Sequence, residues 1–418
     1  MKKLLFVINT LGCGGAERAM LDLLRVLNRE KYEISLFVLT GQGELRDELP
    51  DDVHLLNRDY RSVSVLTKEG RKLLGKRVLR SGIGKGLFVR RAAYLLKNIR
   101  QMCRNGKILP DKLCWRVLAD GAPRMEEAYD LAVASLEGGA TYYVAEHVNA
   151  RKKAAFVHID YGKAGYTREL DLDCYSKYDR IFAVSDEVRT HFLEAYPEYE
   201  EKVCVFHNLV DRKRILHLAE QGTGFTDDFH GIRLLTIGRL TRQKRYDVAI
   251  QAMALLKETC ALPVRWYVLG EGDLRSDLEQ QIRAAGLERD FVLLGVQTNP
   301  YPYCKQCDIY VHATGFEGKS IAIQEAQTLG KPILATDCSG NREQIVHGID
   351  GRVCQLSPEA VCEQLLWMIQ HPEACRAYGE AAGKKVLYHT KGLEQFLALL
   401  DETAERENNE SFDYSTCV

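Results

Sequence analysis

The sequence predicts an α/β protein made of two doubly wound, Rossmann-like domains that face each other across a cleft. Short apolar, β-branched runs alternate with helical patterns along almost the whole chain. Such alternation with continuously apolar strands is typical of parallel sheets that are covered on both faces. The chain has 418 residues, more than one ordinary core holds, so two domains are expected.

The first domain is expected over residues 1–210. Its expected strands read KLLFVIN, YEISLFVL, DLAVASL, KAAFVHI, RIFAVS and VCVFHN, and its helical stretches include GAERAMLDLLRVLN and SDEVRTHFLEAY. Residues 211–231 are polar and contain three glycines, which is typical of a linker.

The second domain is expected over residues 232–385. Its expected strands read RLLTIGRL, VRWYVLG, FVLLG, IYVHA, PILAT and GRVCQ, and its helices include RYDVAIQAMALLKE, DLRSDLEQQIRAAG, SIAIQEAQTLG and NREQIV. Residues 386–418 are expected to form a C-terminal helix and an acidic tail, of which the last residues, ENNESFDYSTCV, are expected to be disordered.

Composition points to a globular cytoplasmic protein. Hydrophobic residues make up 46% and charged residues 28%, which disfavours disorder, and no apolar run is long enough for a transmembrane helix. The start, MKKLLFVINTLGCGG, has a short apolar run and no cleavage site, so a signal peptide is disfavoured. The 13 cysteines are scattered without a repeated spacing, which indicates reduced thiols.

A net charge of −1 hides a strongly basic segment, expected to be a helical insertion at about residues 60–120. From Arg58 to Arg116 there are 17 Lys and Arg and three acids, so this part carries +14 and the rest −15. Apolar residues are interleaved with the charges, as in RKLLGKRVLRSGIGKGLFVRRAAYLLKNIRQMCR. The segment could contact an anionic membrane, which would place the protein peripherally at the inner face of the membrane. It could also be the solvated face of a helical pair. Nucleic acid is disfavoured as a partner because no motif accompanies the charge.

Ligands of doubly wound folds bind beyond the carboxyl ends of the strands, so the loops there are the candidate site. The first strand ends in NTLGCGGAER, where the N–H groups of a glycine-rich turn around Gly14 and Gly15 could cradle an oxyanion. The same turn could simply join strand to helix. A dinucleotide fingerprint would need a glycine at position 17, where this sequence has Glu17, so no nicotinamide cofactor is expected.

The second domain opens with LLTIGRLTRQKRYDVAI, which places two cations, Arg239 and Lys244, after a strand. Two cations suit a diphosphate, although two surface bases would look the same. No Asp-rich metal site is nearby, so the cations could replace a metal ion and no metal is expected. Further on, TGFEGKSIAIQEA sets Glu317 and Glu325 eight positions apart. The two carboxylates could be a hydrolytic pair, but a glycosidase has no use for diphosphate-binding cations.

Taken in order, GRLTRQK, YVLGEGDLRSDLEQQI, VLLGV and FEGKSIAIQEAQTLGKPILATD resemble the retaining GT-B glycosyltransferases of family 4, the E-x7-E glycosyl transferases group 1. The resemblance is strong over the second domain and weaker for GGAER, FVHIDY and FHNLVD in the first. It implies that Arg239 and Lys244 bind the donor diphosphate, that Glu325 binds the ribose hydroxyls and that Glu317 binds the donor sugar.

The resemblance also implies further donor contacts. These are expected from Gly14, Gly15, Gly270, Gly272, Val296, Gly318, Lys319, Ser320 and Ile321. Lys319 departs from many family members, so it could contact either the diphosphate or the acceptor. His158 could approach the donor sugar or be structural, and we place it with Glu317, Arg239 and Lys244 among the catalytic candidates.

Four other positions carry weaker expectations. Asp160 is a minor site candidate, Glu137 could cap a helix or contact the acceptor, and Asn208 is expected to order the crossover between domains. The lone pair Cys304 and Cys307 has no second pair with which to bind zinc and is expected to be structural.

The expected activity is a metal-independent, retaining hexosyltransferase that needs no cofactor. Its donor would be a nucleotide diphosphate sugar, with UDP favoured by the resemblance, and its acceptor a glycan or a lipid-linked glycan in polysaccharide or cell-envelope biosynthesis. Fixed cations and N–H groups would stabilise the leaving diphosphate. Two alternatives stay open: a nucleotide-sugar 2-epimerase, and a non-catalytic nucleotide-sugar-binding subunit of a transferase.

Overall fold

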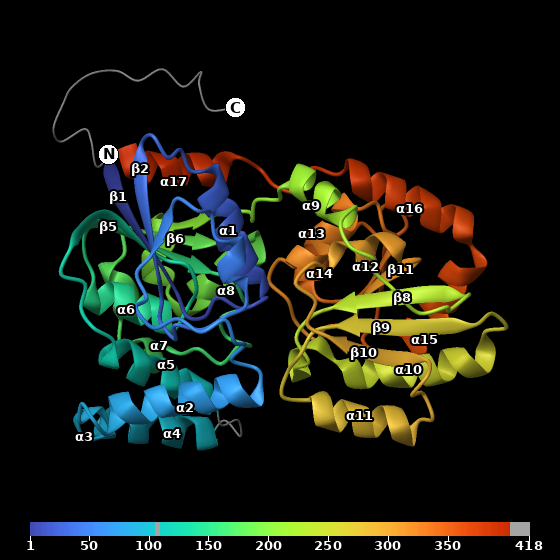
Figure 1. The fold of residues 1–418 in the computed structure, drawn as a ribbon, viewed down its shortest axis with the longest axis horizontal. Helices are drawn as coiled ribbons and strands as arrows, with labels where there is room; N and C mark the ends of the chain where they lie inside the picture. The colour runs from blue at the N-terminus through green and yellow to red at the C-terminus, as the bar shows by residue number, and fades with distance from the viewer. Residues whose placement is uncertain (105–108, 402–418) are drawn as a thin grey trace.

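The protein consists of two α/β domains that lie side by side (Figure 1). A computed structural model describes residues 1–104 and 109–401. Each domain has one parallel sheet with buried apolar clusters, which confirms the predicted fold class. The tail residues ENNESFDYSTCV lie outside the described residues.

The first sheet has seven parallel strands in the order β3-β2-β1-β4-β5-β6-β7. They are β1 (Lys2–Ile8), β2 (Tyr32–Val38), β3 (Val53–Leu55), β4 (Ala128–Ala134), β5 (Asn149–Val157), β6 (Arg180–Ala183) and β7 (Val203–Val205). β3 was not predicted. The helices are α1 (Gly15–Val26), α2 (Lys68–Gly82), α3 (Leu87–Arg90), α4 (Ala92–Arg104), α5 (Pro110–Gly121), α6 (Gly139–His147), α7 (Arg168–Asp171) and α8 (Asp186–Ala195).

The second sheet has six parallel strands in the order β10-β9-β8-β11-β12-β13. They are β8 (Ile232–Ile237), β9 (Val264–Leu269), β10 (Phe291–Gly295), β11 (Ile309–His312), β12 (Ile333–Thr336) and β13 (Arg352–Cys354). The helices are α10 (Tyr246–Thr259), α11 (Arg275–Ala284), α12 (Tyr301–Gln306), α13 (Ile321–Thr328), α14 (Ser339–Gln344), α15 (Pro358–Gln370) and α16 (Pro372–Lys384).

Both sheets reverse their strand order at one point, between β1 and β4 in the first domain and between β8 and β11 in the second. A doubly wound sheet opens a crevice at this switch point, outside the carboxyl ends of the strands. The loops that leave β1, β4, β8 and β11 carry the glycine turn, Glu137, Arg239 and Glu317. The topology therefore gathers the candidate residues at the two crevices.

The basic segment forms the helices α2 to α5, which extend the first domain at the lower left of Figure 1. Within the described residues, no helix is long and apolar enough to cross a membrane.

The segment expected to be a linker, residues 211–231, contains the helix α9 (Arg212–Ala219). Ile215 and Ala219 of α9 are buried against Tyr301 of the second domain. This part of the predicted linker is thus packed structure, because its two buried apolar residues lie four positions apart on one helix face.

The last described helix, α17 (Lys391–Asp401), returns to the first domain. Phe396, Leu399 and Leu400 are buried in one apolar cluster with residues of β1 and β5. The chain therefore crosses between the domains twice, once after β7 and once between α16 and α17.

Candidate active site

A cavity between the domains is lined by loops at the carboxyl ends of strands of both sheets. The first domain contributes the loops after β1 and β2 and residues 64–66 before α2. The second contributes the ends of β8, β9 and β10 and the helix α13. Of the predicted donor-binding residues, those that line this cavity are Gly14, Arg239, Gly270, Val296 and Glu325.

Arg239 follows β8, and its side chain is exposed and forms no ion pair with any described residue. Gly270 packs against this loop so closely that a Cβ atom there would clash with the carbonyl of Gly238. Burial raises the pKa of Glu17 and of Glu137, and the Arg239 charge opposes that rise. The guanidinium therefore acts on first-domain carboxylates from across the cavity and is free to meet an anionic ligand.

The half-buried Lys244 and Glu317 form a charge cluster with the buried His312. The Lys244 ammonium is paired with the Glu317 carboxylate, and it also lies 3.3 Å from His312 Nε2. His312 Nε2 is 3.2 Å from Glu317 Oε2. A Cβ atom at Gly238 would lie 3.4 Å from Lys244 Cε, so Lys244 packs next to the loop that carries Arg239.

The protonation state of this cluster follows from its contacts. Burial opposes ionisation of Glu317, but the Lys244 charge and His312 outweigh it and lower the pKa of Glu317 to about 2. Burial and then the Lys244 charge lower the pKa of His312, which favours a neutral ring. His312 was not singled out in the sequence, although a polar residue at the end of a buried strand is a usable signal.

Glu325 is buried on α13 and accepts a hydrogen bond from the Tyr301 hydroxyl at 2.8 Å. The Tyr301 hydroxyl in turn accepts from Arg18 Nη1 at 3.2 Å. Burial raises the pKa of Glu325, and the charge of Arg18 counteracts this. Arg18 and Tyr301 were not predicted as site residues, because their role depends on a contact between the domains.

The turn from Gly318 to Ile321 joins Glu317 to α13. The Ser320 hydroxyl caps the helix by accepting from Ile323 N at 3.4 Å, while Ser320 N–H donates to Gln344 Oε1 at 2.7 Å. A donor contact was expected from Ser320, but in the structure its backbone N–H is satisfied within the protein.

Lys319 lies among charges at the contact between the domains. Burial lowers the pKa of Lys319 to about 8, although Glu343 and Asp186 oppose the shift. Lys319 is not among the residues that line the cavity.

His158 lies within the first domain, and its ring stacks on that of Phe156 with the ring centroids 6.1 Å apart. The backbone N–H of His158 donates to Glu137 Oε2 at 3.0 Å. His158 also lines a small separate cavity together with Asn208. Burial lowers the pKa of His158 to about 4, so the ring is neutral near pH 7. These contacts fit the structural interpretation of His158 and give Glu137 a positioning role.

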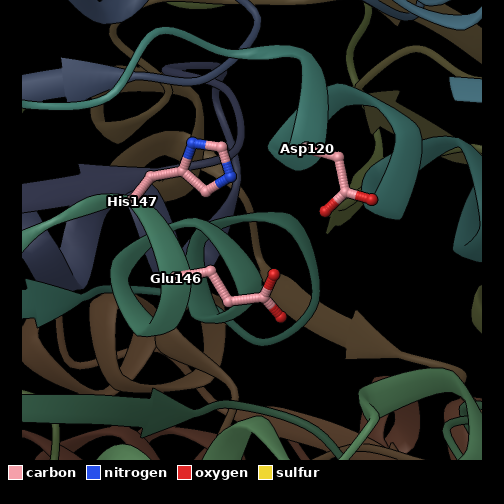
Figure 2. A group of neighbouring side chains, drawn as sticks. All are labelled: Asp120, Glu146 and His147. Carbon is pink, nitrogen blue, oxygen red and sulfur yellow. The ribbon is translucent and has the colours of Figure 1, made fainter. Parts of the chain in front are cut away.

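Two groups of side chains have the composition of metal ligands. Figure 2 shows the first, Asp120 from α5 with Glu146 and His147 from α6. Arg116 is paired with both of these carboxylates and anchors the basic insertion to α6.

The second group contains Asp160, Glu187 and His191, and Lys163 Nζ lies 2.9 Å from Asp160 Oδ2. Basic side chains thus already contact carboxylates of both groups, and neither group lines the cavity. Cys304 and Cys307 are buried and free, and the Cys307 thiol donates to the Cys304 carbonyl at 3.1 Å, which fits a structural role.

Comparisons with known proteins agree on one family. Residues 230–385 match the family model of glycosyl transferases group 1. A relative from Campylobacter jejuni, an N-acetylgalactosamine-N,N'-diacetylbacillosaminyl-diphospho-undecaprenol 4-alpha-N-acetylgalactosaminyltransferase, is 24% identical over 388 residues, which cover 91% of this chain and 94% of that protein. An Escherichia coli relative, a UDP-Gal:alpha-D-GlcNAc-diphosphoundecaprenol alpha-1,3-galactosyltransferase, is 28% identical over 163 residues, 37% of this chain and 42% of that protein.

Solved structures show the same architecture. Anabaena HepE in complex with UDP-glucose has a TM-score of 0.63 at 17% identity, with 97% of this chain and 99% of that chain covered. The lipopolysaccharide outer core galactosyltransferase WaaB has a TM-score of 0.53 at 14% identity, with 96% and 99% covered. The fold and the family model lead to one assignment: the chain has the GT-B architecture, and its second domain belongs to the glycosyl transferases group 1.

Proposed function

We propose that the protein transfers a hexose from a UDP-sugar to a lipid-linked glycan, with retention at C1 and without a metal ion, in the biosynthesis of a cell-envelope polysaccharide. The observation that carries this proposal is the cavity between the domains, in which an unpaired Arg239 and the buried carboxylate of Glu325 line one space. A cation for a diphosphate and a carboxylate for vicinal hydroxyls are the groups that a nucleotide sugar needs.

The roles within the site follow from charge and placement. Arg239 would meet the diphosphate, joined by Lys244 once the ligand competes with Glu317 for its ammonium. Glu325 would accept from the ribose hydroxyls, and Glu317 from hydroxyls of the donor sugar. Fixed cations would stabilise the charge that develops on the leaving diphosphate, which lowers the barrier of C1–O cleavage.

Retention would come from attack on the same face that the leaving phosphate vacates, with that phosphate accepting the proton of the acceptor hydroxyl. The two cations would do the work that a metal ion does in other diphosphate sites. Contact of the two domains would exclude water and so limit hydrolysis of the donor.

The acceptor class rests on the relatives. The names of the Campylobacter jejuni and Escherichia coli relatives both describe transfer to a sugar on diphospho-undecaprenol or diphosphoundecaprenol. An acceptor of that class would lie at a membrane surface, so the enzyme would act there.

The basic insertion offers a surface for this contact. Five large apolar side chains of α2 to α4 and the turns between them are exposed among the basic residues: Leu79, Ile83, Val89, Leu96 and Ile99. Apolar side chains that insert between headgroups, together with Lys and Arg that attract anionic lipid, form an interfacial surface. We propose peripheral binding through this surface.

The reaction is tested by incubating the protein with labelled UDP-sugars and a diphosphate-linked lipid glycan, with and without a chelator. Labelled lipid glycan that forms equally with chelator supports the proposal, and the anomeric configuration of the product tests retention. A new nucleotide sugar would indicate the epimerase instead. Donor binding without any turnover would indicate a non-catalytic subunit.

A further inference from the structure

Arg18 belongs to the first domain but reaches the part of the cavity that the second domain builds. It stands on α1, and its guanidinium donates from Nη1 to the Tyr301 hydroxyl at 3.2 Å and from Nη2 to the Thr298 carbonyl at 3.3 Å. Both acceptors are neutral atoms of the second domain. Arg18 lines the same cavity as Glu325 and Val296.

The contact continues to Glu325. A tyrosine hydroxyl has a single proton, and here Tyr301 donates it to Glu325 Oε1 at 2.8 Å while accepting from Arg18. Arg18 therefore decides the direction in which the Tyr301 proton points. No described residue donates to the other carboxylate oxygen, Oε2, which leaves it for a ligand hydroxyl.

The helix that carries Arg18 is held against the helix that carries Glu325. A Cβ atom at Gly15 of α1 would lie in ordinary contact with the Ile321 side chain of α13, at 3.7 Å. The geometry of Arg18, Tyr301 and Glu325 thus exists only when the two domains meet at this surface.

We infer that Arg18 is a positioning residue of the donor site: it acts through Tyr301 on Glu325 and couples nucleotide-sugar binding to the contact between the domains. This inference rests on the proposed function, in which Glu325 holds the ribose. In this view the first domain helps to bind the donor as well as the acceptor. Movement of the domains apart withdraws Arg18 and weakens the hold on the ribose.

The test uses the full chain and calorimetric binding of UDP, together with donor KM and kcat. Arg18→Ala and Tyr301→Phe should each weaken UDP binding and raise the donor KM about tenfold, the usual effect of a charge-assisted or buried hydrogen bond. Arg18→Lys should restore part of the affinity. The double variant should lose no more than the worse single variant, because both residues act along one path.

Arg25, another arginine of α1, supplies the matched control. It pairs with Asp22 at 2.7 Å and lies outside the cavity, so Arg25→Ala should leave the UDP affinity unchanged. If Arg18→Ala keeps the UDP affinity unchanged but lowers the melting temperature, the inference is overturned, and Arg18 only stabilises the contact between the domains. Additive losses in the double variant would also overturn it.

Glu325→Ala separates this inference from the proposed function. If Glu325→Ala does not weaken UDP binding, the assignment of the ribose site fails and the inference falls with it. If Glu325→Ala weakens UDP binding but Arg18→Ala and Tyr301→Phe do not, only the inference fails.

Discussion

Lys244 and Glu317 form an ion pair, and this pair sets the charge of the proposed diphosphate site. Burial alone would favour a neutral Glu317, but the Lys244 charge and His312 bring its pKa to about 2. Glu317 is therefore ionised throughout the physiological pH range, and its negative charge neutralises the charge of Lys244. A diphosphate has to compete with a carboxylate for this ammonium.

The pair gives opposite expectations for its two members. Lys244→Met should weaken UDP binding by more than about tenfold, since charge-assisted hydrogen bonds are the strong ones. Glu317→Gln should leave UDP binding at least as tight, because it releases Lys244, but should lower turnover with the intact donor. Calorimetry with UDP and initial rates with the donor measure the two effects. Weaker UDP binding in Glu317→Gln would contradict the assignment of Glu317 to the sugar.

Lys319 provides a test through pH. Its ordinary pKa is 10.5, and burial lowers the pKa in the folded protein to about 8. Between these values the unfolded chain holds the proton more tightly, so stability rises with pH from about 8 to 10.5. Below about pH 8 the whole penalty for burying the charge is present.

Lys319→Met should therefore raise the melting temperature at pH 7 and flatten the rise above pH 8. Melting curves over this pH range, measured for both proteins, check the expectation. A lower melting temperature of the variant at pH 7 would show that the attraction of Glu343 and Asp186 outweighs the cost of burial.

At the scale of elements, the turn before α13 is a point of close contact between the two domains. A Cβ atom at Gly318 would clash with the His158 carbonyl at the end of β5, and one at Gly340 would clash with the carbonyl of Gly318. The loop that carries Glu317 is thus held between α14 and the first domain without room for a side chain.

Gly318→Ala should force the domains apart at this contact, with lower turnover and a lower melting temperature. Gly75→Ala is the matched control, because Gly75 lies inside α2 with no atom within 4 Å of its Cβ position. That control should be neutral or more stable by about 0.5–1 kcal/mol, the helical preference of alanine over glycine. Equal behaviour of the two variants in melting and turnover would contradict a tight contact at Gly318.

The elements also show which parts of the site a sequence reveals. Arg239 and Glu317 could be identified because they follow strands, and Glu325 because it lies in the helix of the same recognisable motif as Glu317. Arg18 and Tyr301 come from different domains and are distant in sequence, so spacing along the chain carries no signal for their contact. His312, by contrast, ends a buried strand five positions before Glu317, so a sequence signal was available for it.

At the scale of the whole molecule, α17 completes the core of the first domain after the chain has built the second. Phe396 is fully buried, and its ring centroid lies 6.2 Å from that of Phe156 and 5.8 Å from that of Phe182. The chain therefore ties the two domains together by its connectivity, while the core that α17 completes belongs to the first domain.

Phe396→Ala should destabilise the first domain by about 3–5 kcal/mol, the usual cost of a cavity left by a buried phenylalanine. Hydrogen exchange should quicken in β1 and β5 and stay slow in β8 and β9. Val386→Ala, at a side chain that is 73% exposed before α17, should change little. Uniform loss of protection in both domains would contradict separate cores.

The basic insertion predicts binding to anionic vesicles that weakens with salt, since screening reduces the attraction of exposed charges. Leu79→Ser combined with Val89→Ser should reduce sedimentation with such vesicles. Leu262→Ser, at an exposed leucine of the second domain, should not. Sedimentation that is absent, or independent of salt, would contradict the membrane surface and leave a solvated basic face.

The sequence by itself determined the fold class, the order of the strands along the chain and the motifs of the donor site, because periodicity, strand ends and glycine turns are local properties. The tertiary structure decided which residues meet. It paired Lys244 with Glu317, turned the Ser320 N–H to Gln344 and kept His158 within the first domain. It also set Arg18 beside Tyr301 across the cleft. These outcomes depend on side chains that compete for the same partners in a packed interior, and only the folded chain settles that competition.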